Sequence, residues 1–552
     1  MFRIVFACVL ASSALAQPPL VYNRAVLNGA SFAPPGIPGG AIAQGSIFTI
    51  FGSNLGPAQA QRAATYPLNT SLAGTSIAVS QGNTTVNAIP FYVSSGQINA
   101  IMPSNAPVGL ASLRVVVGGT KSNAVPVQVT TTSFGIFAAN SAGSGPGILQ
   151  NFVSAASTPT NAPTMAAQPG QTIILWGTGL GPISGADNVT PPVANLAGVK
   201  AEVFVGGQPA TVAYAGRAPG FAGTDQINFV VPRNAPSGCW VPVYVRTNGT
   251  NVSNFVTISI QANGATCSDA LNPLANALVA GGKTGAIAIV RETTHEDVSV
   301  TVPVDVAADF TIGAFSSFSA APYAFHPALS LPPAGTCTEY TGKADLAHGS
   351  FVGFAMPPPG AALNAGSPPV LTGPPGKVTF TPVLPGYQGA LIGSSAPGAM
   401  SGSLSLSPGT YTVSGGGGAD VGSFTATLNV PSAITWVNRN QITDIDRSQP
   451  LTVSWTGSGP NDVVGLVGVG ADITSNSATA FACVAQPGTN SLTVPADVLS
   501  NVPPTQQYVL NSADVIYLVS IPQSAIAAIK ATGLDTGVAL FAYVNGKTVI
   551  FQ

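Results

Sequence analysis

Residues 170–182 read GQTIILWGTGLGP, and residues 45–57 read GSIFTIFGSNLGP. The two stretches align without a gap at an offset of 125 residues, so that Gly45 aligns with Gly170. Each stretch begins with β-branched and aromatic residues and ends in glycines, which is typical of a buried strand that leads into a tight turn. Neither stretch has the GxGxxG spacing before a helix or a glycine run ending in Gly-Lys-Ser/Thr, so no nucleotide-binding loop is predicted.

A second pair of similar phrases follows in the same order. GQINAIMPSNAP at 96–107 aligns with DQINFVVPRNAP at 225–236 at an offset of 129 residues. Since two pairs of phrases recur in one order, the sequence predicts two homologous domains in tandem. Their predicted boundaries are 17–135 and 136–262.

Apolar residues inside each unit alternate with polar ones, which indicates strands with one buried face. Leu113 and Val115 follow this pattern in the first unit, as do Val241, Val243 and Val245 in the second. Glycine pairs and Asn-Gly steps separate the runs as turn signals. About seven such strands in roughly a hundred residues is the spacing of an immunoglobulin-like (Ig-like) β-sandwich. We therefore predict an all-β, multi-domain chain with tandem Ig-like β-sandwich domains after an N-terminal signal peptide.

A family resemblance extends over residues 22–262. The phrases VLNGASF, GSIFTIFGSNLGP, FYVSSGQINAIMP, GQTIILWGTGLGP, AGRAPGFAGTDQINFVVP and SNFVTISI resemble the double Ig-like domain of a family of secreted acidobacterial proteins, which is itself similar to IPT/TIG domains. The resemblance implies a fold and does not imply an activity. It supplies no catalytic residue for this sequence.

The first sixteen residues, MFRIVFACVLASSALA, combine one positive charge, a short apolar run and small residues before the cleavage position. This pattern predicts a secretory signal peptide over residues 1–16. No later stretch has the roughly 20 continuous apolar residues that a membrane span needs. We therefore expect a secreted protein, extracellular or at the cell surface, without a membrane span.

Charged residues make up 7% of the chain, and its 17 Lys and Arg residues are scattered singly. A protein that binds a phosphate backbone needs a basic patch, so nucleic acid is excluded as a predicted partner. Few carboxylates can couple protonation to unfolding, so we expect the free energy of unfolding to stay flat from about pH 4 to 7.

Different β-rich sequence follows the repeat. It predicts a third region over 263–430, of one or two subdomains, and a C-terminal β-sandwich-like domain over 431–552 with one short helix near Pro495 to Asn501. Residues 355–376 are rich in proline and glycine and are interpreted as a linker or a long loop. The whole chain is expected to form a rod of successive sandwiches.

Four cysteines remain after removal of the signal peptide: Cys239, Cys267, Cys337 and Cys483. An even number in an exported chain favours disulfide bonds. Cys239 opens one predicted strand and Cys267 follows its hairpin partner, which favours a bridge between them and leaves Cys337 to pair with Cys483. Three connectivities stay open at this point.

Candidate metal ligands are few. His295 lies beside Glu292, Glu296 and Asp297, but a solvated turn is the favoured interpretation. The oxygen-rich stretches with Asp420, Asp444 and Asp446 are interpreted as ordinary turns rather than calcium sites. His326 and His348 are isolated, and Gly-x-Ser-x-Gly does not occur. We predict no catalytic residue, no metal site and no cofactor.

Two groups of side chains are candidates for ligand contact. Gln97 and Asn99 on one strand face recur as Gln226 and Asn228, and these amides are expected to satisfy the backbone of a neighbouring loop, with contact to a sugar as the alternative. The four tryptophans are expected in the core, with a sugar-stacking platform as the alternative. They are Trp176, Trp240, Trp436 and Trp455.

Three functional hypotheses follow. The first is a non-catalytic secreted or cell-surface Ig-like module protein that acts as a spacer, in adhesion or in interaction, with an extracellular protein or polysaccharide as partner. The second is an extracellular carbohydrate-binding protein. The third is an enzyme with an unfamiliar site in residues 263–552.

Overall fold

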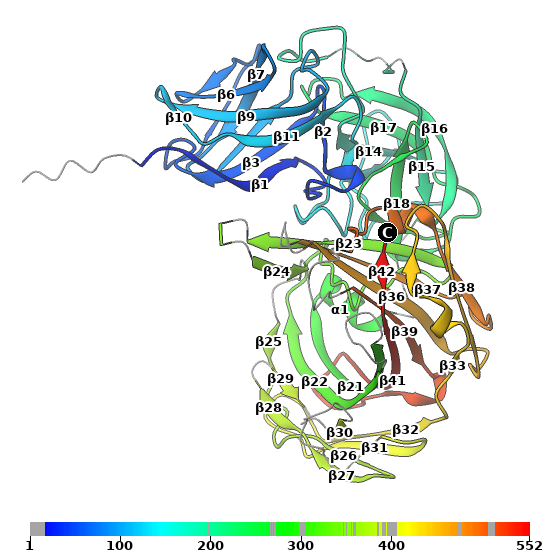
Figure 1. The fold of residues 1–552 in the computed structure, drawn as a ribbon. Coiled ribbons are helices and arrows are strands. Elements are labelled where there is room, and N and C mark those ends of the chain that lie inside the picture. The colour runs from blue at the N-terminus through cyan, green and yellow to red at the C-terminus, as the bar shows by residue number, and fades with distance from the viewer. Residues whose placement is uncertain are drawn as a thin grey trace, which may run out of the picture.

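The computed structural model describes residues 17–552 except for 192, 194, 197, 265, 268, 270, 271, 297–303, 346, 349, 355, 357–359, 384, 385, 389–392, 395–405, 473–476 and 506–513. Residues 1–16 lie outside the described part, so the signal peptide stays a prediction. Figure 1 shows a first module in blue, a second module in cyan and green, and a C-terminal body below them. We define these parts as residues 20–130, 135–260 and 273–551.

The first module is a β-sandwich with strands in the order β1-β3-β8-β7-β6-β9-β11-β2. In β9 the side chains of Ala111, Leu113 and Val115 are buried, and those between them are exposed, as the alternation predicts. The elements are β1 (Leu20–Asn28), η1 (Pro38–Gly40), β2 (Ile42–Ala43), β3 (Ile47–Ser53), β4 (Gln61–Arg62), β5 (Ser71–Leu72), β6 (Thr75–Gln81), β7 (Thr84–Val93), β8 (Gln97–Ile101), β9 (Gly109–Val117), β10 (Thr120–Lys121) and β11 (Val125–Thr130).

The second module repeats this arrangement, with the order β12-β14-β17-β16-β15-β18-β19 and with β20 paired to β18. The equivalent strands β3 and β14, β8 and β17, β7 and β16, β6 and β15, and β9 and β18 follow one another in the same order in both modules. The predicted all-β fold with Ig-like sandwiches is confirmed. The strands are β12 (Gly135–Ile136), β13 (Leu149–Asn151), β14 (Thr172–Thr178), β15 (Ala201–Val205), β16 (Gln208–Arg217), β17 (Asp225–Val230), β18 (Gly238–Thr247), β19 (Asn251–Val252) and β20 (Val256–Ile260).

The C-terminal body is built on one large sheet, whose described strands run in the order β24-β23-β37-β36-β39-β41-β21-β22-β29-β28. Helix α1 (Pro273–Ala280) leads into it. The strands are β21 (Gly282–Glu296), β22 (Val304–Phe318), β23 (Thr336–Asp345), β24 (Ser350–Phe354), β25 (Ala361–Ala362), β28 (Thr381–Val383), β29 (Gly386–Gln388), β30 (Gly393–Ser394), β36 (Val463–Asp472), β37 (Ser477–Val484), β39 (Val515–Ile521), β40 (Ile526–Ala528) and β41 (Thr536–Thr548).

Smaller sheets cover this large sheet. The order β27-β26-β31-β32 forms one, β33-β35-β38 a second and β34-β42 a third. The short helix α2 (Ala496–Ser500) occupies the segment where a helix was predicted. The remaining elements are β26 (Val370–Gly373), β27 (Gly376–Thr379), β31 (Gly409–Gly415), β32 (Phe424–Val430), β33 (Thr435–Trp436), η2 (Arg439–Gln441), β34 (Asp444–Ile445), β35 (Leu451–Thr456), β38 (Ser491–Val494), η3 (Gln523–Ala525) and β42 (Ile550–Phe551).

Strands from both sides of the predicted boundary at 430/431 share the large sheet. The segment Thr284–His295 of β21 pairs in parallel with Thr536–Lys547 of β41, and Figure 1 shows the green β21 beside the red β41. The structure thus differs from the expected division into 263–430 and 431–552. Period-two alternation identifies strands, but it does not identify which strands pair across 250 residues.

Two disulfide bonds are present, Cys239–Cys267 and Cys337–Cys483. Cys337 on β23 lies directly opposite Cys483 on β37, so the second bridge also joins residues from both sides of 430/431. Within the described residues, no helix is long and apolar enough to cross a bilayer.

The second module and the C-terminal body share hydrophobic cores. Tyr244 and Phe255 of the second module stack at 4.4 Å and belong to one buried cluster with Trp455 and Phe551 of the body. Another cluster combines the Cys239–Cys267 region with Tyr340 of β23. A continuous core fixes the parts against each other, so the expected rod of successive sandwiches is wrong for this half of the chain.

The shared sheet predicts the behaviour of a truncated chain. In a fragment of residues 17–430, β21 lacks its parallel partner β41 and β23 lacks β37. We expect limited proteolysis of this fragment to degrade residues 263–430 while the two Ig-like modules survive, because the modules keep their own cores. A protease-resistant 263–430 core, identified by mass spectrometry, would contradict the shared-sheet topology.

Candidate functional site

A buried ion pair joins the two Ig-like modules. Arg217, at the end of β16, pairs with Asp225 at the start of β17, and their side chains are 3% and 0% exposed. Arg217 Nη2 also donates to the carbonyl oxygens of Gly181 at 2.7 Å and of Gly45 in the first module at 2.8 Å. Asp225 accepts the backbone N–H groups of Gly179 and Leu180, both at 2.7 Å. Burial raises the pKa of Asp225, while Arg217 and these two N–H groups oppose the shift.

This joint explains the two repeated stretches. Gly45 has a φ of +70°, and a Cβ there would lie 2.0 Å from Arg217 Nη2. Gly179 has a φ of +108°, and a Cβ there would lie 2.1 Å from the carbonyl oxygen of Ser133. Gly45 is required for its backbone conformation and for the close approach of Arg217 from the second module, and Gly179 is required for its backbone conformation and its contact with Ser133. The carbonyl oxygen of Gly45 accepts from Arg217, and the N–H of Gly179 donates to Asp225.

The pair lies at the two ends of a loop that is longer in the second module than in the first. Residues 218–224 separate β16 from β17, whereas residues 94–96 separate the equivalent strands β7 and β8. Arg217 and Asp225 are structural residues that were not predicted from the sequence. Two signals could have identified them. The offset between the repeated phrases rises from 125 to 129 residues, which indicates an insertion in the second unit, and two opposite charges flank that region in a chain with few charges.

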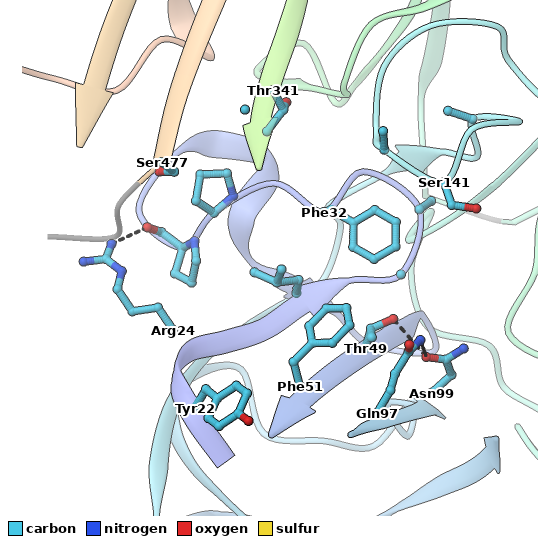
Figure 2. A pocket seen from close by; sticks show the side chains of 18 of the residues that line it. Tyr22, Arg24, Phe32, Thr49, Phe51, Gln97, Asn99, Ser141, Thr341 and Ser477 are labelled. Atoms are coloured by element: carbon cyan, nitrogen blue, oxygen red, sulfur yellow. Dashed lines mark hydrogen bonds between the residues drawn. The ribbon is translucent and has the colours of Figure 1, made fainter. Parts of the chain in front are cut away.

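A cavity of about 760 Å³ lies where the first module, the second module and the C-terminal body meet. This volume is in the range of pockets for small ligands. Figure 2 shows side chains from all three parts around it. The first module contributes Tyr22, Phe32, Thr49, Phe51, Gln97 and Asn99; the second contributes Phe137, Ser141 and Ile148; the C-terminal body contributes Thr341, Asp345 and Ser477.

The wall from the first module combines aromatic rings with an amide ladder. Phe51 on β3 lies opposite Gln97 on β8, and Thr49 lies opposite Asn99. Asn99 Oδ1 accepts the Gln97 side-chain amide at 2.8 Å and the Thr49 hydroxyl at 3.1 Å (Figure 2). Phe32 tilts against Phe51, with ring centroids 6.4 Å apart. The amides therefore bond to each other and to Thr49, and not to the backbone of a neighbouring loop as expected.

The charged groups at the cavity have partners. Arg24 donates to the carbonyl oxygen of Pro35 at 2.5 Å and lies 3.4 Å from the carboxylate of Asp472. Its Nε is buried and has no hydrogen-bond partner within the described residues. Asp345 is 2.6 Å from Nδ1 of the exposed His348, and this contact lowers the pKa of Asp345. Paired charges of both signs leave the cavity without a strong net charge.

His295 does not lie on a solvated turn. It lies near the end of the long strand β21, where its Nδ1 is 2.9 Å from Asp305 Oδ1. Glu292 and Glu296 alternate with His295 along that strand, so they point to the opposite face; Asp297 lies outside the described residues. His326 is half-buried, and burial lowers its pKa.

The three aspartates considered for calcium do not converge. Asp420 accepts the backbone N–H of Asn364 at 2.7 Å, and Asp446 accepts the hydroxyl and the N–H of Ser448. Asp444 lies on β34. In the part of the chain that the structure describes, no three His, Cys, Asp or Glu side chains are grouped so that they could hold a metal ion.

The tryptophans fall into two classes. Trp240, Trp436 and Trp455 are at most 8% exposed and belong to the core. Trp176 is only half-buried, and its indole N–H donates to Gln150 Oε1 at 2.9 Å. The expectation of core packing is therefore correct for three of the four.

A buried carboxyl lies between the second module and the C-terminal body. Glu339 on β23 is 3% exposed. It is hydrogen bonded to the Asn501 side chain and to the N–H of Phe255. Burial raises the pKa of Glu339 to about 8, although these two hydrogen bonds act to lower it. Its Oε2 atom has no hydrogen-bond partner among the described residues. The protonated form of Glu339 therefore fits this interface better than the carboxylate.

Comparisons with known proteins agree with the fold. Residues 35–132 match the model of the IPT/TIG domain family. This match covers the first of the two repeated units. The search of curated proteins finds no match.

Solved structures resemble the chain at low identity. SGBP-B from a complex xyloglucan utilization locus in Bacteroides uniformis is 12% identical, with 88% of each chain covered and a TM-score of 0.15. SGBP-B of the Bacteroides ovatus mixed-linkage glucan utilization locus, in complex with a mixed-linkage heptasaccharide, is 12% identical over 89% of this chain and 93% of that chain, with a TM-score of 0.13. Domains 5–6 of the S-layer protein SbsC are 14% identical over 44% and 98%, with a TM-score of 0.15. At these TM-scores the likenesses carry no argument about a ligand.

The inter-module ion pair gives a stability prediction. Arg217→Met should lower the free energy of unfolding by about 3–5 kcal/mol in chemical denaturation, because Asp225 is left buried without its partner. Lys200→Met is the matched control, since Lys200 is exposed and pairs with Glu202 at 2.9 Å; it should cost less than about 1 kcal/mol. Equal effects of the two substitutions would show that the buried pair does not hold the modules together.

Glu339 changes the expected pH profile. Its pKa is about 8 in the folded protein against an ordinary value of 4.5, so the unfolded chain releases a proton between these pH values that the folded chain keeps. The stabilisation is complete below pH 4.5 and is lost as the pH rises through 8, at up to about 1.4 kcal/mol per pH unit. We expect the free energy of unfolding to fall from pH 5 to 8 in the wild type and to fall less steeply in Glu339→Gln. Parallel profiles for the two proteins would contradict this assignment.

Proposed function

We propose that the protein is a secreted or cell-surface, non-catalytic Ig-like module protein that binds a neutral extracellular polysaccharide. The observation that supports this most directly is the cavity between the modules, with aromatic rings beside an amide ladder. The two disulfide bonds agree with a location outside the cytoplasm. The proposal contains no catalytic step, and its partner is a carbohydrate rather than a nucleic acid.

The lining of the cavity matches the chemistry of a sugar ring. A pyranose presents C–H groups on its faces and hydroxyl groups around its rim. Phe51, Phe32 and Tyr22 offer apolar surface for the faces. Gln97 Oε1 and Asn99 Nδ2 have no protein partner in the described residues, and they offer an acceptor and a donor for hydroxyl groups.

Rigid attachment of the modules favours binding at this place. The ion pair of Arg217 fixes the first module on the second, and the shared core fixes the second on the C-terminal body. Ser104 of the first module donates two hydrogen bonds of 2.7 Å to Asp187, which lies in the loop between β14 and β15 of the second module. A cavity held in this way is preformed, so binding does not have to order it.

The family to which the second module belongs is part of the proposal. We infer that residues 136–262 form a second domain of the same kind as residues 35–132, since equivalent strands have the same order in both. We also propose a relation to secreted acidobacterial proteins with a double Ig-like domain, which the repeated phrases resemble.

Electrophoresis in gels that contain hydroxyethyl cellulose, xyloglucan, galactomannan or dextran tests the function. We expect at least one polymer to retard the wild type. Phe51→Ala removes a ring face and Gln97→Leu removes an amide, so each variant should bind that polymer about tenfold more weakly. Gln128→Leu is the matched control, because Gln128 is exposed on β11 outside the cavity; it should bind as the wild type does. Thermal melts confirm that each variant is folded.

Failure of every polymer in such a panel to retard the folded wild type would contradict the polysaccharide proposal. The role of a spacer without a ligand would then remain.

A further inference from the structure

The second module repeats the aromatic and amide ladder of the cavity wall. Trp176 on β14 lies opposite Gln226 on β17, as Phe51 lies opposite Gln97 in the first module. Asn228 Oδ1 accepts the Gln226 side-chain amide at 2.8 Å, which is the geometry of the first ladder. The two copies differ in that the first faces the cavity, whereas none of the residues of the second lines it.

An exposed aromatic ring lies against the second ladder. Trp176 is half-buried, and its N–H bond to Gln150 fixes the plane of the indole. Phe221 is 57% exposed and meets Trp176 edge-to-face, with ring centroids 6.1 Å apart at an interplanar angle of 80°. The two rings stand at nearly a right angle and form a corner, in which Phe221 offers exposed ring surface.

The polar groups of this ladder can bind hydroxyl groups. Gln226 Oε1 and Asn228 Nδ2 have no protein partner within the described residues. Trp176, Phe221, Gln150, Gln226 and Asn228 are all uncharged. This surface therefore complements a neutral ligand with hydroxyl groups and apolar faces, and it offers no ion pair to a charged one.

The second ladder borders the cavity. Ile148 lines the cavity and is 38% exposed. Its carbonyl oxygen accepts the backbone N–H of Trp176 at 3.3 Å, so the strand with Trp176 is bonded directly to the cavity lining. A polymer that leaves the cavity past Ile148 meets the Trp176 ladder next.

We propose that the second ladder, defined as Trp176, Phe221, Gln150, Gln226 and Asn228, is a second contact site for the polysaccharide chain that occupies the cavity. This inference rests on the proposed function. A polysaccharide chain that is already bound in the cavity reaches the second site intramolecularly, so its overall affinity rises by about tenfold or more. A short oligosaccharide confined to the cavity gains nothing from the second site.

The test uses the full chain with Trp176→Ala and Phe221→Ala. The probes are the polymer that retards the wild type most and a trisaccharide of the same polymer, measured by gel electrophoresis and by calorimetry. We expect both variants to bind the polymer at least about tenfold more weakly and the trisaccharide as the wild type does. Phe152→Ala is the matched control, because Phe152 is a 42% exposed aromatic of the same module outside the ladder. Trp176→Phe should restore part of the polymer binding, which a folding defect would not allow.

Three outcomes overturn the inference in distinguishable ways. Unchanged polymer binding by both ladder variants, with binding lost in Phe51→Ala, removes the second site and leaves the proposed function intact. Absence of polymer binding by the wild type removes both. A wild type that self-associates in analytical ultracentrifugation and becomes monomeric with Phe221→Ala would assign the ladder to contact between copies of this chain.

Discussion

The buried pair of Arg217 and Asp225 is the interaction on which the arrangement of the modules depends. Its charges would be costly to bury alone, and they are stabilised by each other, by two backbone N–H groups and by two carbonyl oxygens. One of those carbonyl oxygens belongs to Gly45 of the first module. The pair therefore satisfies the hydrogen-bonding groups of a loop in the second module. Through Gly45 it also fixes the first module against the second, and both modules line the cavity.

Several of the few charges in the chain lie at interfaces between its parts. Arg217 joins the modules, and Arg246 of the second module contacts Asp497 of α2 at 3.2 Å. Tyr244 donates to the same carboxylate at 2.8 Å. Glu339 is buried at the same interface, where a neutral carboxyl is favoured. A small number of acids therefore does not imply a flat pH profile, because burial raises the pKa of some of them, such as Glu339 and Asp225.

The sequence predicted the local features of the fold and missed those that depend on distant partners. Alternation along β9 and the repeated phrases were enough to predict the Ig-like modules, since one buried face leaves a direct trace in the residue pattern. The pairing of β21 with β41 leaves no such trace, and the predicted boundary at 430/431 was drawn through one sheet. The amide pairs were recognised as repeated, but their bonds to each other depend on cross-strand register. The cavity could not be predicted, because it exists only where surfaces of three parts of the chain meet.

The most direct measurement is a crystal structure of the full chain with a trisaccharide of the polymer that retards it. We expect electron density for a sugar ring against Phe51, with hydroxyl groups at Gln97 and Asn99, and a bond from Arg217 to the carbonyl oxygen of Gly45. Density for the sugar elsewhere on the chain, or a first module detached from Arg217, would contradict it.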